Sequence, residues 1–238
     1  MTTQVRIKTR KGEGGNVLFL ILIAVALFAA LSYAVTQSTR SGGGDASKEK
    51  SLVSSATVTQ YPASVKTAIV RMMISNGVSV DSLLFDKPPY TNLTTDALKK
   101  AAVFYPDPGG GATYSTASAD VGTTGAPLPW YFNGENEVKN IGTNPASGSV
   151  PTASSADVIA FLPDITKAVC DKVHEQLGMA KTYATLAANI TDTNQADPGI
   201  DFGGVIITSA VLDGQPQGCF LLSTGPDRYV YYHVLVER

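Results

Sequence analysis

Two cysteines and two histidines are the side chains of this 238-residue chain whose chemistry is most distinctive. Cys170 and Cys219 are separated by 49 positions, and such a pair forms a disulfide in an oxidising compartment. Two buried free thiols, which pack like small apolar residues, are the alternative. Neither His174 nor His233 has metal-ligand spacing to a second histidine, a cysteine or a pair of carboxylates. We therefore expect both histidines to be structural.

Catalytic and ligand-binding motifs are otherwise missing from the sequence. It contains no G-x-x-x-x-G-K phosphate loop and no G-x-S-x-G elbow, and no nucleophile, base and orienting group can be assembled from it. The net charge is −2, with no basic stripe interleaved with aromatic residues. We predict that the protein is not an enzyme and that it binds no metal, cofactor or nucleic acid. A membrane-tethered hydrolase remains a third hypothesis.

The N-terminal region contains an apolar run of 19 residues, Val17 to Val35. As a helix this run would be about 28 Å long, close to the hydrocarbon thickness of a bilayer. A secretory signal peptide has a shorter apolar core and a small-residue cleavage site, whereas polar "TQSTRSGGGD" follows this run. A transmembrane helix at residues 16–35 is the prediction, and cleavage after Ala34 is the alternative.

Four basic residues precede the apolar run and set its expected orientation. Only Glu13 opposes them, so the positive-inside bias keeps the N-terminus in the cytoplasm; the bases are Arg6, Lys8, Arg10 and Lys11. The prediction is a single-pass protein of the inner membrane, with its main domain in the periplasm or outside the cell.

Helical periodicity resumes beyond a glycine-rich stretch. Gly42, Gly43 and Gly44 each disfavour helix by about 1 kcal/mol relative to alanine, which predicts a hinge at residues 36–50 where the helix stops or loosens. Apolar residues then recur at spacings of three and four from Leu52 to Met73. Pro62 predicts a kink or restart near Gln60, and Asn76-Gly77 predicts the C-terminal end.

The rest of the chain reads as an α+β domain over residues 51–238. Glycine, serine, threonine and proline predict loops at 105–155, with a small hairpin at Asn133-Gly134 and an aromatic cluster at 130–132 that covers the core. A helix is predicted from a stripe of apolar residues that stops at Gly178, and an antiparallel three-strand meander follows from residue 203; the stripe is Ile165, Val169, Val173 and Leu177. The expected fold is an N-terminal transmembrane and amphipathic helix packed on a C-terminal antiparallel β-sheet.

This order of parts resembles a type IV pilin or a pseudopilin of type II secretion. A basic leader, residues 1–15, ends in Gly14-Gly15; an apolar helix follows directly, then an amphipathic continuation, variable loops and a sheet with a late disulfide. The resemblance implies that a prepilin peptidase cuts after Gly15 and leaves Asn16 as the first of 223 residues. It also implies that the partners are copies of the chain or other pilin-like subunits.

Two positions depart from the family pattern. Members usually start the mature chain with an aromatic or apolar residue and carry glutamate at its fifth position, where this chain has Asn16 and Leu20. In the family that buried carboxylate pairs with the amino terminus of a neighbouring subunit, which offsets the cost of a charge in the membrane. Leu20 cannot form this pair, and some minor members of the family also lack the glutamate. The departure favours a minor subunit, and it equally weighs against the family.

Three alanines provide a separate indication of self-packing. Ala26, Ala30 and Ala34 recur at spacing four, a pattern of small residues that lets helices approach closely in lipid. The hypothesis is a structural subunit of a pilus-like filament or pseudopilus, assembled through the helix faces from Leu20 to Ala34. The alternatives are an ordinary anchor and, as a function, a membrane-tethered periplasmic binding or sensory domain that is neither processed nor polymerised.

Overall fold

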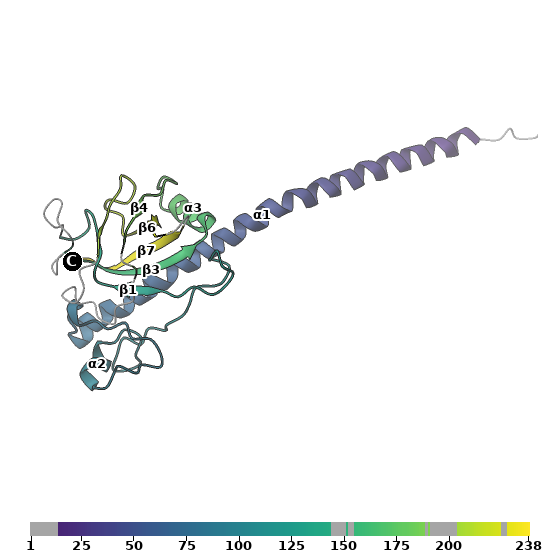
Figure 1. The fold of residues 1–238 in the computed structure, drawn as a ribbon. Helices are drawn as coiled ribbons and strands as arrows, with labels where there is room; N and C mark the ends of the chain where they lie inside the picture. The colour runs from purple at the N-terminus through teal and green to yellow at the C-terminus, as the bar shows by residue number, and fades with distance from the viewer. Residues whose placement is uncertain (1–13, 144–150, 152–154, 189, 191–203, 225–227) are drawn as a thin grey trace, which may run out of the picture. The chain divides into compact units, whose positions relative to one another are not determined.

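The computed structural model describes residues 14–143, 151, 155–188, 190, 204–224 and 228–238 (Figure 1). The chain forms two compact units, Met1–Glu49 and Lys50–Arg238. In its described part the first unit is helical, and the second combines helices with β-strands. The α+β class with an N-terminal apolar helix is confirmed. The predicted leader lies outside the described residues as far as Glu13.

Helix α1 (Gly14–Asn76) includes two stretches where a break was predicted. The backbone is helical through Gly42, Gly43 and Gly44, so the predicted stop at residues 36–50 is not observed. Glycine weakens a helix without forbidding it, and helix-compatible residues flank the triplet on both sides. The helix also continues through Pro62, where proline removes one backbone donor. The end at Asn76 is as predicted, with Gly77 at a φ of +64°.

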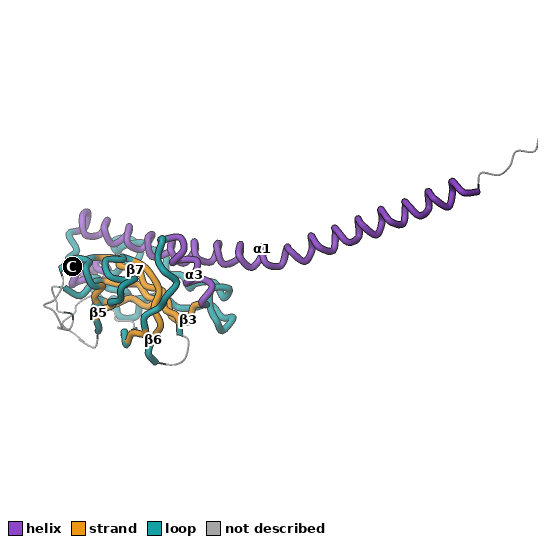
Figure 2. The backbone as a smooth tube through the Cα atoms, turned by 90° about the horizontal axis from the view of Figure 1, so that it is seen from above, coloured by secondary structure: helices purple, strands orange, loops and turns teal. Residues whose placement is uncertain are grey.

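The second unit is built on a five-stranded mixed sheet (Figures 1 and 2). Its strand order is β1-β3-β7-β6-β4, where the first four strands pair antiparallel and β4 runs parallel to β6. A second sheet has two parallel strands, β2 and β5. The bounds are β1 Tyr131–Asn133, β2 Glu137–Val138, β3 Val158–Ile165, β4 Thr185–Leu186, β5 Ile206–Ile207, β6 Gln217–Leu222 and β7 Tyr229–Val236.

The predicted antiparallel meander is correct only for β6 and β7. The strand expected first in that meander contains β5, which pairs in parallel with β2 instead. The neighbour of β7 on its other side is β3, which precedes β6 by more than 50 residues. Because β4 and β5 add parallel pairs, the C-terminal sheet is mixed and the prediction of a purely antiparallel sheet is wrong.

The hairpin predicted at Asn133-Gly134 is also wrong. Strand β1 pairs with β3 and β2 pairs with β5, so the two strands that flank the turn do not pair with each other. A type I′ turn needs a positive φ at both central residues, and neither Asn133 nor Gly134 has one. The side chain of Asn133 instead accepts hydrogen bonds from Glu135 N and Asn136 Nδ2, which turns the chain locally.

The central strands are buried on both faces, because side chains alternate between two apolar clusters. On β7, Tyr231 and Leu235 belong to the cluster that contains the helix residues, whereas Tyr232 and Val234 belong to the other. The C-terminal part of α1 packs on the first face, as predicted. Its contributions to that cluster are Val58, Val65, Ile69 and Met72.

The aromatic residues predicted to cover the core are part of it. Trp130 and Phe132 are fully buried, and the Trp130 ring lies 5.2 Å from that of Tyr61 on α1. On the same helix the Lys66 ammonium donates to Val234 O on β7 over 3.4 Å. These contacts attach the helix to the sheet within the second unit.

Three short helices connect these elements. A 3₁₀ turn, η1 (Val80–Ser82), follows α1, and α2 (Asp96–Ala101) is capped by the hydroxyl of Thr95, which accepts from Leu98 N. Helix α3 (Lys167–Gln176) is capped by Thr166. The expected stop after α3 is found at Gly178, with a φ of +69°, whereas Ile165 ends β3 and is not in the helix.

Candidate functional site

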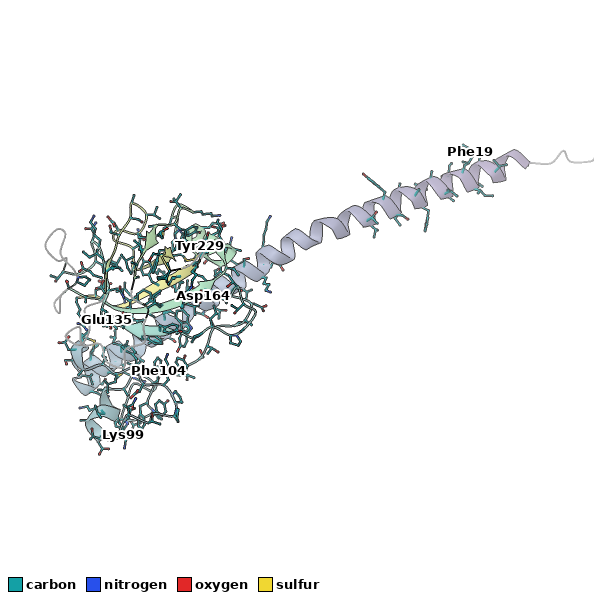
Figure 3. All side chains as sticks on the ribbon, viewed as in Figure 1. Phe19, Lys99, Phe104, Glu135, Asp164 and Tyr229 are labelled. Atoms are coloured by element: carbon teal, nitrogen blue, oxygen red, sulfur yellow. A yellow bond between two sulfur atoms is a disulfide. The ribbon has the colours of Figure 1, made fainter. Side chains whose placement is uncertain are left out.

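The first unit exposes an apolar helical segment, Leu18–Thr36, that is long and apolar enough to cross a membrane. All its side chains are exposed in the structure, which Figure 3 illustrates with Phe19. A soluble protein rarely leaves so large an apolar surface uncovered. The segment is therefore consistent with a single-pass membrane anchor, the coarser part of the predicted localisation.

The helix places the predicted assembly residues on two faces. Ala26, Ala30 and Ala34 are all exposed and, four residues apart in a helix, share one face. Leu20 is exposed too but lies about 120° around the helix axis from Ala26. The structure thus provides a continuous small-residue face from Ala26 to Ala34, and Leu20 is not part of it.

The predicted processing residues lie at the start of the same helix. The backbone of Gly15 and Asn16 is helical, one and two residues beyond the first residue of α1. Their side chains are outside the described part of the structure. The Gly15–Asn16 bond therefore stays a prediction as a cleavage site.

At the other end of the apolar segment, a polar side chain is satisfied within the helix. The hydroxyl of Thr36 lies 2.6 Å from Ser32 O and 3.0 Å from Tyr33 O, so it can donate to a carbonyl of the preceding turn. This pattern lets a hydroxyl sit near lipid without an unpaired donor. Thr36 is thus compatible with the end of a membrane span.

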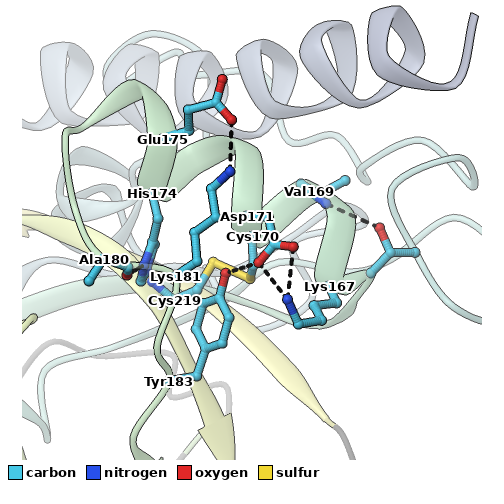
Figure 4. A network of polar contacts seen from close by, with 11 residues as sticks. Lys167, Val169, Cys170, Asp171, His174, Glu175, Ala180, Lys181, Tyr183 and Cys219 are labelled. Atoms are coloured by element: carbon cyan, nitrogen blue, oxygen red, sulfur yellow. Dashed lines mark hydrogen bonds and ion pairs between the residues drawn. A yellow bond between two sulfur atoms is a disulfide. The ribbon is translucent and has the colours of Figure 1, made fainter. Parts of the chain in front are cut away.

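The second unit contains the predicted disulfide between Cys170 and Cys219 (Figure 4). Cys170 is on α3 and Cys219 on β6, and both are fully buried. The alternative of two free thiols is therefore wrong. The bond ties α3 to the sheet and closes a loop across 49 positions.

His174, one turn after Cys170, reinforces this junction. Its Nε2 accepts a hydrogen bond from Cys219 N at 2.9 Å, and its Nδ1 lies 2.7 Å from Ala180 O. A carbonyl can only accept, so these partners assign the proton to Nδ1. Burial lowers the pKa of His174, although Ala180 O and Asp171 favour the charged form. The prediction of a structural histidine is confirmed here.

Charged side chains of α3 form two sets of polar contacts, one around Asp171 and one around Glu175 (Figure 4). Asp171 accepts hydrogen bonds from the Lys167 ammonium at 2.8 Å and from the Tyr183 hydroxyl at 2.6 Å. Burial raises the Asp171 pKa, but these two bonds outweigh it, so the pKa lies below its usual value. Glu175 pairs with Lys172 and Lys181. Pairs as exposed as these position the segment after α3 more than they stabilise the fold.

His233, the second histidine, is also held by neighbours in the sheet. Its Nδ1 lies 3.0 Å from the hydroxyl of Tyr231, which in turn lies 2.8 Å from Gln217 Oε1. Burial and the nearby Lys66 ammonium lower the pKa of His233 to about 4. A histidine that stays neutral and hydrogen-bonded on a strand agrees with the predicted structural role.

Two carboxyl groups, which no sequence pattern predicted as a pair, are buried near the short parallel sheet. Asp157 accepts hydrogen bonds from Val138 N at 2.9 Å and Arg238 N at 3.1 Å. Burial nevertheless raises its pKa to about 7, and the neighbouring Glu137 adds to the rise. Burial also raises the pKa of Glu137 itself. No sequence pattern marks this pair, because residues 137 and 157 come together only through the fold.

A groove of about 400 Å³ between α1 and the loop at 110–115 was not predicted either. Five of its side chains carry hydroxyl groups, and Arg71 is its charged residue. The hydroxyl side chains on the helix side are Tyr61, Ser64 and Thr67, and those on the loop are Thr113 and Ser115. The groove brings the Arg71 guanidinium close to these hydroxyl groups.

Within the described residues, no group of three or more histidine, cysteine, aspartate or glutamate side chains could hold a metal ion. The apolar helix and the disulfide-linked domain are therefore the features on which a functional hypothesis can rest. No protein-family model, curated protein or solved structure matches this chain.

Proposed function

We propose that the protein is a structural subunit of a type IV pilus-like filament or secretion pseudopilus, in a minor role, and that it assembles through its N-terminal hydrophobic helix. The observation that carries the proposal is the exposed apolar segment Leu18–Thr36, which begins directly after a basic leader ending in Gly14-Gly15. In a filament, copies of this segment cover one another in place of lipid.

The second unit is consistent with export. A disulfide between Cys170 and Cys219 forms stably in an oxidising compartment such as the periplasm. The four bases before the span favour a cytoplasmic N-terminus, which puts the disulfide-bearing domain on the opposite side of the membrane. The proposed partners are copies of the chain, other pilin-like subunits and, during maturation, a prepilin peptidase.

A second candidate is a membrane-tethered periplasmic binding or sensory domain that is neither processed nor polymerised. Leu20 favours this candidate, because its side chain cannot form the charge pair that the pilin glutamate makes with the amino terminus of a neighbouring subunit. The groove at Arg71 also suits a binding module. This candidate predicts a full-length N-terminus and no filament fraction.

A substitution in the alanine face separates the two candidates. Ala30→Leu keeps the helix apolar but fills the small-residue face, so we expect membrane insertion to persist and incorporation into sheared filaments to fall. Phe28→Leu is the matched control, because Phe28 lies on the opposite side of the helix from Ala30. Wild-type protein that never enters the filament fraction, or an Ala30→Leu variant that enters it normally, would contradict the proposal.

A further inference from the structure

The outward face of α1 in the second unit is unusually poor in charge. Between Lys50 and Val80 the chain has no acidic residue, and its only bases are Lys66 and Arg71. A helix face that stays in water normally carries charged residues of both signs. Here it exposes Val70 and Ile74, the latter at 78% of its surface. The face therefore has the composition of a contact surface.

Arg71 is an exposed residue of this stretch of α1 and lines the groove. Its Nη2 donates to Gly110 O, and within the described residues it has no carboxylate partner. A guanidinium has five N–H donors, so most of them remain available to a ligand. One bond to the loop fixes its position without neutralising its charge.

The loop wall of the groove is held firmly by its backbone. Gly110 N donates to Ala102 O at 2.9 Å and Ala112 N donates to Val103 O at 3.1 Å. A Cβ on Gly110 would lie 2.4 Å from Val103 O and 2.6 Å from Met72 Sδ, so only glycine fits. The groove is therefore formed before any ligand arrives, which reduces the entropic cost of binding.

The serine and threonine hydroxyl groups on the helix wall can serve a ligand as acceptors. Ser64 donates to Tyr61 O at 2.7 Å and Thr67 donates to Ala63 O at 2.9 Å, so their protons are already used within the helix. Their oxygen lone pairs remain able to accept from a peptide N–H. The groove thus combines acceptors for a backbone with a cation for a carboxylate.

We propose that this surface, defined by the groove, Arg71, Val70 and Ile74, binds an acidic segment of a second copy of this chain. The inference rests on the proposed function, which brings copies together. Arginine and tyrosine flanked by apolar residues are enriched at protein interfaces, which favours a protein over a small anion. The occupant is a second copy because residues 50–238 contain 17 acidic against 12 basic residues. Exposed carboxylates such as that of Asp96 therefore complement Arg71.

Site-specific photocrosslinking in the full-length chain tests the surface. A photoreactive phenylalanine replaces Thr67 in membranes of the native host, and the adduct is identified by mass and peptide mapping. We expect an adduct of twice the chain mass, joined to a segment that contains aspartate or glutamate. Arg71→Glu should lower its yield about tenfold, whereas Arg71→Lys, which keeps the charge, should retain most of it.

Two further positions make the result interpretable. The same probe at Ser223, an exposed residue directly after β6 that does not line the groove, should give no such adduct. The probe at Ala30 reports contact through the apolar helix and thus tests the proposed function. Three results would overturn this inference but leave the proposed function standing. They are an adduct at Ala30 without one at Thr67, an adduct to a different protein, and an adduct at Thr67 whose yield Arg71→Glu leaves unchanged. Absence of adducts at both positions would overturn the proposed function as well.

Discussion

The backbone N–H of Cys219 donates to Nε2 of His174 at 2.9 Å, four residues along α3 from the cysteine that forms the disulfide with Cys219. Helix α3 is therefore joined to β6 twice, by a covalent bond and by a hydrogen bond that exists only while the imidazole is neutral. Protonation of Nε2 would set two N–H donors against each other. The junction should accordingly depend on both redox state and pH.

We expect acid to weaken this junction. The folded-state pKa of His174 lies below its ordinary value of 6.5, so the folded protein binds fewer protons there than the unfolded chain. The contribution of His174 to stability is complete above pH 6.5 and is lost as the pH falls through the folded-state pKa. His174→Gln should cost about 1–2 kcal/mol at pH 7.5, and this difference from wild type should shrink towards pH 5.

The comparison with His174→Gln removes the other titrating groups from the measurement. Asp157, whose pKa is raised to about 7, has the opposite effect, because its stabilising contribution is lost as the pH rises through 7. His233 acts in the same sense as His174 but at lower pH. Asp157 and His233 are present in both the wild type and the His174→Gln variant, so their effects cancel in the difference. A difference in unfolding free energy that stays constant from pH 7.5 to 5, measured by urea unfolding in detergent, would refute the role of His174.

Removal of the disulfide should destabilise the second unit. Replacing both Cys170 and Cys219 with alanine opens a loop closed across 49 positions, and the chain-entropy model gives a loss of about 4 kcal/mol. The midpoint of urea unfolding reports it, and treatment of the wild-type protein with a reductant under unfolding conditions is the control. Equal midpoints for the oxidised, reduced and alanine proteins would show that the bond contributes nothing.

Trp130 should be the most costly single aromatic side chain to remove. It is buried between Tyr61 of α1, at 5.2 Å between rings, and Tyr231 of β7, at 6.1 Å. Trp130→Ala should lower the free energy of unfolding by about 3–5 kcal/mol, measured by circular dichroism. Tyr131→Ala, at the half-buried neighbouring position, is the matched control and should cost clearly less. Similar losses in both variants would mean that Trp130 does not join helix to sheet.

The glycine triplet offers a test of helix continuity. If Gly42, Gly43 and Gly44 are helical in the assembled state, their replacement with alanine should be tolerated and should favour the helix by about 1 kcal/mol per residue. Gly43→Pro should instead disrupt incorporation into filaments. Loss of incorporation in the triple alanine variant, with its helical content retained, would indicate that this stretch must unwind during assembly.

Local features of the fold were predictable where one residue type decides the conformation. Gly77 and Gly178 adopt the positive φ that ends a helix, and Thr95 supplies a capping hydroxyl. Strand β3 was missed because it is buried on both faces, so it lacks the polar alternation of a surface strand, and Pro163 interrupts it. The predicted hairpin does not form at Asn133, because hydrogen bonds to its side chain replace the expected type I′ turn.

The candidate sites likewise divide into features that the sequence predicts and features that only the fold brings together. The cysteine pair and the alanine face could be predicted, because pairing and helical spacing follow from the sequence itself. The groove could not be predicted, since it requires Arg71 and a loop about 40 residues later to meet. The absence of acidic residues around Arg71 was the available clue. The pairing of Asp157 with the strand at residue 138 depends on tertiary contacts alone.

The N-terminal sequence and intact mass of the protein recovered from membranes of its own host test the central claim most directly. The proposed function predicts a chain of 223 residues that begins at Asn16, after cleavage behind Gly15. A chain that begins at Met1 or Thr2 would contradict it and leave a tethered domain. A chain that begins near Val35 would contradict it differently, because the apolar segment would then be a signal peptide.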